Sequence, residues 1–236
     1  MHKAIAFVKR KFYKPKSYRS RLDDKGINFA HEPLRHFPTG RGLEEYLRTF
    51  RLSIRQLKGK EVLDVGSGGN DFVEEGQENG INVTALNPRP DSRQRNVVAK
   101  TIQEVDFEKK FDYVIASLSV PFYLRRAHDT RLAVFNMLKA LKPSGRALIF
   151  PIYKRVRNKN NVISEIWTFK LEYGQHADTL IRKLKECGFK CNFSRDIENR
   201  GSRYYSETLE NYVLEIKRTR FSNLKKLERW LSLTED

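Results

Sequence analysis

Short apolar segments alternate with amphipathic segments along most of the chain. Apolar residues from Leu43 to Leu57 recur with a helical period, whereas Glu61–Val65 is a short apolar run followed by glycine, as is typical of a buried strand. By the same criteria, the predicted strands are Glu61–Val65, Ile81–Leu86, Val97–Ala99, Phe111–Ala116, Arg146–Phe150, Phe189–Phe193 and Tyr212–Ile216. The predicted helices are Leu43–Leu57, Phe72–Asn79, Arg131–Leu141, Ala177–Glu186 and an amphipathic segment from Phe221 to Leu231.

This order of elements predicts an α/β fold with a doubly wound, mostly parallel seven-stranded sheet and helices on both faces. A turn over Asn199–Arg203, and no helix, joins the last two strands, so the final strand is expected to be antiparallel. We predict one domain over residues 43–218, preceded by a basic, partly ordered extension over residues 1–42. A C-terminal amphipathic helix within residues 219–236 packs on this domain or extends from it.

The composition fits a single domain of enzyme size. With 236 residues, of which 39% are hydrophobic, the chain can bury one sizeable α/β core but not two. No apolar run approaches the roughly 20 residues that span a bilayer, and none resembles a secretory signal. Cys187 and Cys191 have poor spacing for zinc, so we predict no metal site and interpret both as reduced core residues of a cytoplasmic protein.

The net charge of +17 predicts attraction to RNA, DNA, an acidic protein or an anionic membrane surface. A solubility adaptation or a basic proteome background would give the same charge. Before Asp23, the chain contains many basic residues and no acidic one. This segment is compatible with a nucleic-acid arm, a helix in peripheral contact with a membrane, an organelle targeting sequence or a solvated tail.

The most specific motif is the glycine-rich turn VLDVGSGGND over residues 62–71, which follows the first predicted strand. Glycine adopts positive φ readily and lets a backbone approach a ligand without a Cβ in the way. A glycine turn between a parallel strand and a helix commonly holds a nucleotide-like cofactor. The pattern G-x-G-x-x-G is absent and no acidic residue ends the second strand, which disfavours a nicotinamide dinucleotide.

Four motifs, in the expected order, resemble those of the class I S-adenosylmethionine-dependent methyltransferases. Residues 62–69 (VLDVGSGG) resemble the first motif of the family, and residues 111–117 (FDYVIAS) resemble its fourth-strand motif. Residues 137–146 (MLKALKPSGR) resemble the turn before the fifth strand, and residues 184–189 (LKECGF) resemble the turn before the sixth. The resemblance covers roughly residues 43–218 and implies a Rossmann-like fold, S-adenosylmethionine as cofactor and methyl transfer as the reaction.

The resemblance also implies roles for individual residues. Asp64 and the backbone of residues 66–68 would face the amino-acid moiety of the cofactor. The backbone N–H of Ile102 would face the adenine ring with Thr101 beside it, and Ser117 would line the floor near the sulfonium. The residues that the resemblance assigns to the cofactor are Asp64, Gly66, Ser67, Gly68, Asn87, Thr101, Ile102 and Ser117.

Three positions depart from the family pattern. Asn70 stands at the third glycine, although Asn can also adopt a left-handed conformation, and Ser144 replaces a glycine before the fifth strand. At the end of the second strand, Asn87 replaces the acidic residue that accepts both ribose hydroxyls. An amide oxygen accepts a hydrogen bond without the charge of a carboxylate. We therefore expect weaker cofactor binding, unless Asp91 reaches the ribose.

Two predicted loops, residues 118–126 and 151–159, follow the fourth and fifth strands and mix aromatic with basic residues. Ligands bind beyond the carboxyl ends of such strands, so both loops would lie on the acceptor side. The composition is typical of phosphate contact with base stacking, or of aromatic loop anchors among solvated charges. The acceptor-side candidates are Phe122, Tyr123, Arg125, Tyr153, Lys154 and Arg155.

Methyl transfer from a sulfonium needs alignment and a dry site, and it needs a base only if the acceptor must lose a proton, so we assign no catalytic residue. The sequence leaves three hypotheses. The first is a methyltransferase acting on RNA or another polyanion. The second is a methyltransferase for a small metabolite or a lipid, with the N-terminal segment as an anchor. The third is a degenerate, non-catalytic binding module, to which Asn70 and Asn87 point.

Overall fold

The computed structural model describes residues 41–68, 70–88, 90, 97–121, 124, 127–159, 162–169, 177–195, 203–204 and 207–233. The predicted N-terminal extension lies outside the described residues except for Arg41 and Gly42. Asp91, the alternative ribose ligand, and the turn expected over Asn199–Arg203 also lie outside them, apart from Arg203.

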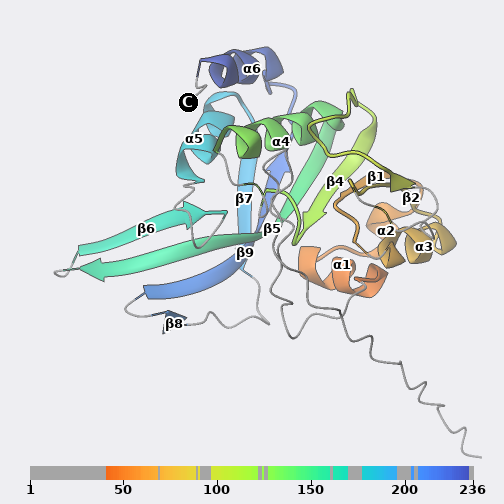
Figure 1. The fold of residues 1–236 in the computed structure, drawn as a ribbon, viewed down its shortest axis with the longest axis horizontal. Helices are drawn as coiled ribbons and strands as arrows, with labels where there is room; N and C mark the ends of the chain where they lie inside the picture. Colours follow the sequence, from red (N-terminus) through yellow and green to blue (C-terminus); the bar gives the residue numbers. More distant parts are fainter. Residues whose placement is uncertain are drawn as a thin grey trace, which may run out of the picture.

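The strands form one sheet whose main path runs β3-β2-β1-β4-β5-β9-β7 (Figure 1). The neighbouring strands from β3 to β5 pair in parallel, whereas β9 is antiparallel to both β5 and β7. This arrangement confirms the doubly wound, mostly parallel sheet with an antiparallel final strand. The strands are β1 Glu61–Val65, β2 Asn82–Leu86, β3 Val97–Val98, β4 Phe111–Ser117, β5 Leu141–Lys159, β6 Val162–Thr168, β7 Lys190–Arg195, β8 Arg203–Tyr204 and β9 Glu207–Lys217.

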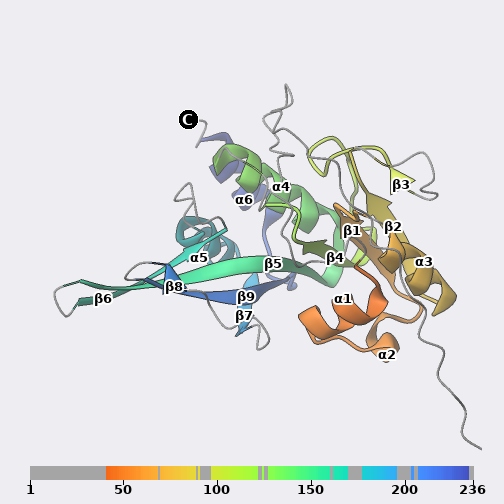
Figure 2. The same cartoon turned by 60° about the horizontal axis from the view of Figure 1, so that its bottom comes forward.

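The helices cover both faces of the sheet, α1 and α2 on one face and α4 and α6 on the other (Figure 2). The helix predicted from Leu43 to Leu57 is divided in two, because Arg51 adopts a left-handed φ of 51° and Ser53 begins a second helix through a capping box with Gln56. The helices are α1 Leu43–Phe50, α2 Ile54–Leu57, α3 Asp71–Glu78, α4 Ala127–Ala140, α5 Asp178–Glu186 and α6 Leu224–Ser232.

Alternating residues of the central strands separate two apolar cores. In β1, Val62 packs with residues of α1 and α3, whereas Leu63 and Val65 pack with residues of α4, α5 and α6. Successive side chains of a strand point to opposite faces, so a continuous apolar run is required where both faces are covered. The fourth residue of β1, Asp64, is the exception to this run, and it is fully buried.

The fifth strand is far longer than predicted. The sequence predicts Arg146–Phe150 followed by a loop over residues 151–159, but β5 continues to Lys159. Its parallel pairing with β4 ends at Phe150, opposite Ser117, and beyond this point β5 pairs with β6 on one side and β9 on the other. We call residues 151–159, β6 and the paired part of β9, residues 207–212, the arm. The loop interpretation was wrong because basic residues in this segment obscured a strand whose two partners come from later in the chain.

The remaining sequence expectations concern turns, thiols and membranes. Ser144, which replaces a glycine, takes a left-handed φ of 66°. Cys187 is buried and Cys191 is half-buried, and both are free thiols. Within the described part of the chain, every helix is too short or too polar to cross a bilayer. The same residues contain no group of three or more His, Cys, Asp or Glu side chains placed to hold a metal ion.

Candidate functional site

The carboxyl ends of β1, β2 and β4 lie next to one another at one edge of the sheet. Val65 pairs with Leu86 of β2, and Asp64 pairs with Ile115 of β4. Between β1 and α3, three residues adopt left-handed backbone conformations: Gly66 at φ 78°, Gly68 at 61° and Asn70 at 73°. Asn70 therefore does take the conformation that the family pattern gives to a glycine.

The turn after β1 is fixed to both neighbouring strands. The backbone N–H groups of Gly66 and Ser67 donate to the Leu86 carbonyl, with N–O distances of 2.7 and 3.2 Å. Ser119, which follows β4, donates its hydroxyl to the Val65 carbonyl. A Cβ on Gly66 would lie 2.5 Å from the Ser119 Cβ, so only glycine fits here. This contact could not be predicted from the sequence, since it joins residues more than fifty positions apart.

Asp64 is the most unusual side chain at this edge. It is 0% exposed, and its Oδ1 accepts a hydrogen bond of 2.9 Å from the Tyr46 hydroxyl. Burial raises the pKa of Asp64 to about 6, while the positive charge of Arg41 and the Tyr46 hydrogen bond act in the opposite direction. Among the described residues, Oδ2 of Asp64 and the nearby Ser67 hydroxyl have no hydrogen-bond partner. A buried carboxylate oxygen left open is suited to accept a donor from a bound ligand.

Arg41 and Tyr46 belong to this site although the sequence did not indicate either. Arg41 donates from Nη1 to the Ser117 carbonyl at the end of β4, and its Nη2 lies 3.6 Å from the position of a Cβ on Gly68. Arg41 thereby connects the ends of β1 and β4. Sequence reasoning assigned it to the basic extension, and it assigned Tyr46 to an apolar helical stripe. A buried tyrosine usually requires a hydrogen-bond partner for its hydroxyl, and this requirement could have indicated that Tyr46 contacts a polar residue.

Asn87 lies directly after β2, at the position that the family fills with an acidic residue. Its Nδ2 donates to the Gly68 carbonyl over 3.5 Å. The amide therefore interacts with the glycine turn itself, and a carboxylate at this position could not donate this bond. The structure thus brings Asn87 next to the glycine turn.

Thr101 and Ile102 follow β3, which pairs with the end of β2. Both are buried, at 8% and 1% exposure. The backbone N–H and hydroxyl of Thr101 donate to Glu104 Oε2 over 2.8 and 3.0 Å, and Asn136 of α4 donates to the Ile102 carbonyl over 3.1 Å. The two residues thus form a rigid corner.

Ser117 ends β4 at the same edge as Asp64. It is 5% exposed, and its carbonyl accepts the hydrogen bond from Arg41. The next residue, Leu118, adopts a left-handed φ of 47° and donates its N–H to the Phe150 carbonyl over 2.7 Å. The candidate cofactor residues at the ends of β1, β2 and β4 are therefore brought together.

The acceptor-side candidates divide into two groups. Phe122, Tyr123 and Arg125 lie outside the described residues. Tyr153 and Lys154 are half-buried residues of β5, and Arg155 pairs with Ile166 of β6 and Leu209 of β9 through its backbone. These three residues lie beyond the carboxyl end of β4, on a strand and not on the predicted loop.

The arrangement fits an α-amino acid joined to a nucleoside. The open Asp64 oxygen can accept from an ammonium group, the Ser67 hydroxyl offers a second polar contact, and the left-handed glycines keep Cβ atoms away from the turn. Asn87 follows β2, and Thr101 and Ile102 follow β3, at the same edge of the sheet. The ribose and base of such a ligand would lie along these residues.

Comparisons with known proteins give a consistent but distant picture. No protein-family model matches the sequence, and no curated protein matches it. Solved structures with a similar course of the chain include the N-methyltransferase NodS from Bradyrhizobium japonicum WM9, with 18% identity, a TM-score of 0.48 and 75% of this chain and 96% of that chain covered.

Two further similar structures were determined with bound cofactor or product. One is the 1,6-didemethyltoxoflavin-N1-methyltransferase from Burkholderia thailandensis with S-adenosylhomocysteine, at 17% identity and a TM-score of 0.46, covering 70% of this chain and 73% of that chain. The other is the magnesium protoporphyrin IX methyltransferase from Synechocystis PCC 6803 with S-adenosylmethionine. It has 16% identity and a TM-score of 0.45, and the comparison covers 70% of this chain and 73% of that chain. Because the TM-scores of all three structures are below 0.5, the fold is assigned from the strand order of this chain and not from these similarities.

Proposed function

We propose that this protein is an S-adenosylmethionine-dependent methyltransferase. The observation that carries the proposal is the buried Asp64 carboxylate, whose Oδ2 is open among the described residues and lies beside a turn with three left-handed residues. Burying a carboxylate without full pairing is unfavourable. A ligand that donates a hydrogen bond to this oxygen would therefore gain binding free energy. The order of the four sequence motifs supports the same cofactor.

Each candidate residue would have a simple task. Asp64 would hold the ammonium group of the cofactor, and the backbone of the turn would hold its carboxylate end. Asn87 would accept from or donate to the ribose, and the corner at Thr101 and Ile102 would receive the adenine. S-adenosylmethionine, when bound, supplies the activated methyl group together with its own leaving group. The chain would then need only to orient the acceptor beyond Ser117 and to exclude water.

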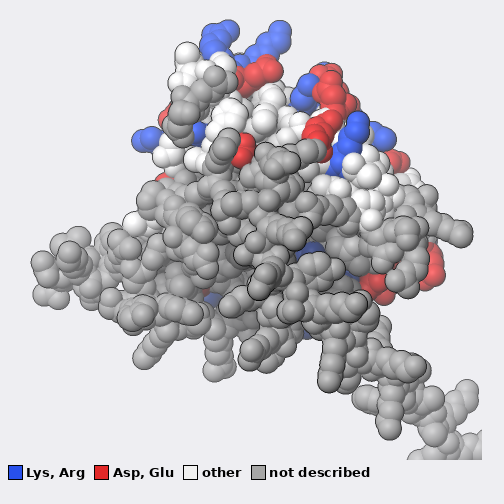
Figure 3. All heavy atoms as spheres, in the orientation of Figure 1, with Lys and Arg blue, Asp and Glu red and all other residues white. Residues whose placement is uncertain are grey.

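For the acceptor, we propose RNA or another polyanion. The support is the net charge of +17 and the position of Tyr153, Lys154 and Arg155 beyond the end of β4. In the coloured part of Figure 3, basic and acidic side chains are mixed over the α4 and α6 region. This region is therefore not the polyanion-binding surface that we propose. The predicted cytoplasmic location belongs to the same proposal.

Transfer of a labelled methyl group from S-adenosylmethionine to RNA tests the proposal, with the S-adenosylhomocysteine product measured in parallel. We expect incorporation into RNA, with binding that weakens as salt rises, by a log–log slope of about −0.7 per phosphate contact on a single strand. Cofactor turnover with a small acceptor and none with RNA would overturn the acceptor class alone. Absence of cofactor binding would overturn the whole proposal.

A second candidate, a methyltransferase-like binding module without turnover, is favoured by one observation. The Asn87 amide is already engaged with the Gly68 carbonyl, and it lacks the charge of the acidic residue that normally accepts the ribose hydroxyls. If Asn87 limits cofactor binding, Asn87→Asp should strengthen it by about tenfold, the value of one added charge-assisted hydrogen bond. Tight binding by the unchanged protein, and weaker binding by the variant, would reject this candidate.

A further inference from the structure

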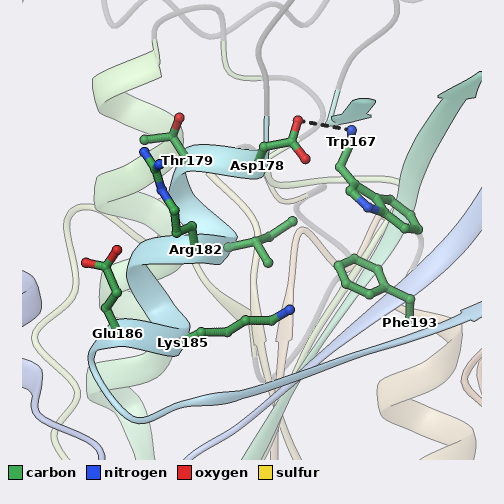
Figure 4. Close-up of a pocket in the computed structure, with 8 residues that line it drawn as sticks. Trp167, Asp178, Thr179, Arg182, Lys185, Glu186 and Phe193 are labelled. Carbon is green, nitrogen blue, oxygen red and sulfur yellow. Dashed lines mark hydrogen bonds between the residues drawn. The ribbon is translucent and has the colours of Figure 1, made fainter. Parts of the chain in front are cut away.

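A groove of about 600 Å³ lies between α5 and strands β6 and β7 (Figure 4). Helix α5 packs in the same core as α4 and α6, on the face of the sheet opposite α1. One wall is apolar and consists of Trp167 of β6, Phe193 of β7 and Ile181 of α5. The other side carries charged residues of α5, including Arg182 and Lys185. None of these residues belongs to the cofactor edge, and none was assigned to a binding site from the sequence, although Lys185 lies in the motif at residues 184–189.

The aromatic wall is held in place before any ligand arrives. The rings of Trp167 and Phe193 are stacked, with centroids 4.0 Å apart and an interplanar angle of 20°. Tyr212 of β9 packs edge-on against Trp167, with centroids 5.0 Å apart. Trp167 and Phe193 are only half-buried, so part of this fixed aromatic surface faces the groove. A rigid aromatic surface loses little conformational entropy when a planar group packs on it.

Among the described residues, the acidic side chains that line the groove already have hydrogen-bond or ion-pair partners, whereas the basic side chains do not. The Asp178 carboxylate accepts from the Trp167 backbone N–H over 3.2 Å, and Glu186 forms an ion pair of 3.0 Å with Lys183. Arg182 and Lys185 are exposed and form no ion pair or hydrogen bond with the described residues. In Figure 4, Lys185 reaches from α5 toward Phe193, and Arg182 extends along α5 toward Thr179. Two cations thus remain to meet an anion near the aromatic wall.

The groove is close to the proposed acceptor side. Trp167 pairs with Lys154, four residues along β5 from Phe150, which pairs with Ser117 at the end of β4. Four residues of strand span about 13 Å. A ligand of several connected units could therefore occupy the groove and reach the cofactor edge at the same time.

We propose that this groove binds an unpaired nucleotide of a single-stranded RNA. A base would pack on the surface of Trp167 and Phe193, and the flanking phosphates would contact Lys185 and Arg182. An aromatic surface next to cations is the usual basis for binding single strands, and the charge of +17 favours a polyanion over a neutral ligand. The step from RNA binding to RNA as methyl acceptor rests on the proposed function, whereas the binding itself does not.

The test measures the anisotropy of a labelled oligouridylate with the full chain and two charge-matched double variants. Arg182→Ala with Lys185→Ala removes the groove cations. Arg55→Ala with Lys58→Ala removes two exposed cations at α2, on the opposite face. We expect the first pair to weaken binding at least tenfold and to lower the salt slope by about 1.4, for two lost phosphate contacts. We expect the second pair to weaken binding less than threefold.

A second measurement reports on the aromatic wall directly. The chain has two tryptophans, so Trp230→Phe leaves Trp167 as the only one, and its fluorescence should be quenched as the oligouridylate binds. Phe193→Leu should weaken binding at least threefold, with the thermal unfolding transition showing that the variant is folded. Equal weakening by the two double variants, stronger binding of duplex RNA or no quenching would each overturn the proposal. Calorimetry with S-adenosylhomocysteine separates the two ideas, because its failure would leave the groove result standing.

Discussion

The turn after β1 and the arm lie at the same carboxyl end of the sheet, yet they are constructed in different ways. In the turn, Asp64 and Ser67 are buried and three left-handed residues fix the backbone. The arm begins where β5 leaves β4 after Phe150, and in it β5 continues between β6 and β9. The first region offers a small, pre-formed polar site, and the second adds an extended surface.

This difference separates two kinds of recognition. A small cofactor is bound by a few buried groups whose positions cannot vary, since each unpaired buried polar atom is costly. A large acceptor requires area and adaptable contacts, which a strand extension provides without disturbing the core. Changes in the turn should therefore affect the cofactor, whereas changes in the arm should affect the acceptor or the stability of the fold.

The largest effect is expected for Gly66→Ala. Alanine would adopt a left-handed conformation and meet the Ser119 Cβ at 2.5 Å, which together cost about 2–5 kcal/mol of unfolding free energy and abolish cofactor binding. Gly59→Ala is the matched control, because Gly59 has φ 68° but no neighbouring atom within 4 Å, so about 1–2 kcal/mol is expected. Urea unfolding of both variants measures the difference. Similar losses would show that the contact with Ser119 is unimportant.

The base of the arm gives the opposite outcome. Ile152 is 0% exposed and packs in the α4–α6 core just beyond Phe150, so Ile152→Ala should cost about 2–5 kcal/mol of unfolding free energy. Cofactor affinity per folded molecule should stay unchanged. Ile152→Val removes one methylene and should cost about 0.5–1.5 kcal/mol. Loss of cofactor binding in the folded Ile152→Ala variant would mean that the two regions are not separable.

Asp64 predicts a specific dependence of stability on pH. Its pKa is about 6 in the folded protein against 3.8 for an ordinary Asp, so between these values the folded state binds more protons than the unfolded state. Stability therefore falls as pH rises through this window, by about 3 kcal/mol in all. Asp64→Asn removes this penalty, and its gain over the unchanged protein should be small below pH 3.8 and full at neutral pH. Urea denaturation of both proteins at the two pH values measures this gain in unfolding free energy. An equal gain at both pH values would contradict the raised pKa of Asp64.

Tyr46→Phe should have a smaller effect. The ring keeps its stacking on Phe72, at 4.0 Å between centroids, but Asp64 loses its hydrogen bond, which costs about 1–2 kcal/mol. Since that bond lowers the pKa of Asp64, the pH below which cofactor binding fails should move upward. Tyr113→Phe removes a hydroxyl from the same core and serves as control. An unchanged pH profile for Tyr46→Phe would show that the bond does not tune Asp64.

The two regions also differ in how far the sequence predicted them. The strand Glu61–Val65 and the glycine turn were predicted, and Asn70 was recognised as able to adopt a left-handed conformation, because these signals lie within ten consecutive residues. The contacts of Arg41 and Tyr46 were missed, since they join positions far apart in the chain. The arm was missed for the same reason. Its pairing of Tyr153 with Asn211 and Thr168 depends on segments that a local pattern of charges does not reveal.

The most direct test of the account is calorimetry of S-adenosylhomocysteine with the unchanged protein and with Asp64→Asn, each at neutral pH and below pH 6. The account predicts one binding site in the unchanged protein, with affinity that falls as Asp64 becomes protonated below a pKa of about 6. The variant should bind at least tenfold more weakly and with no such pH dependence. No heat of binding at millimolar ligand, or equal affinity of the two proteins, would contradict the claim that Asp64 and its turn form the cofactor site.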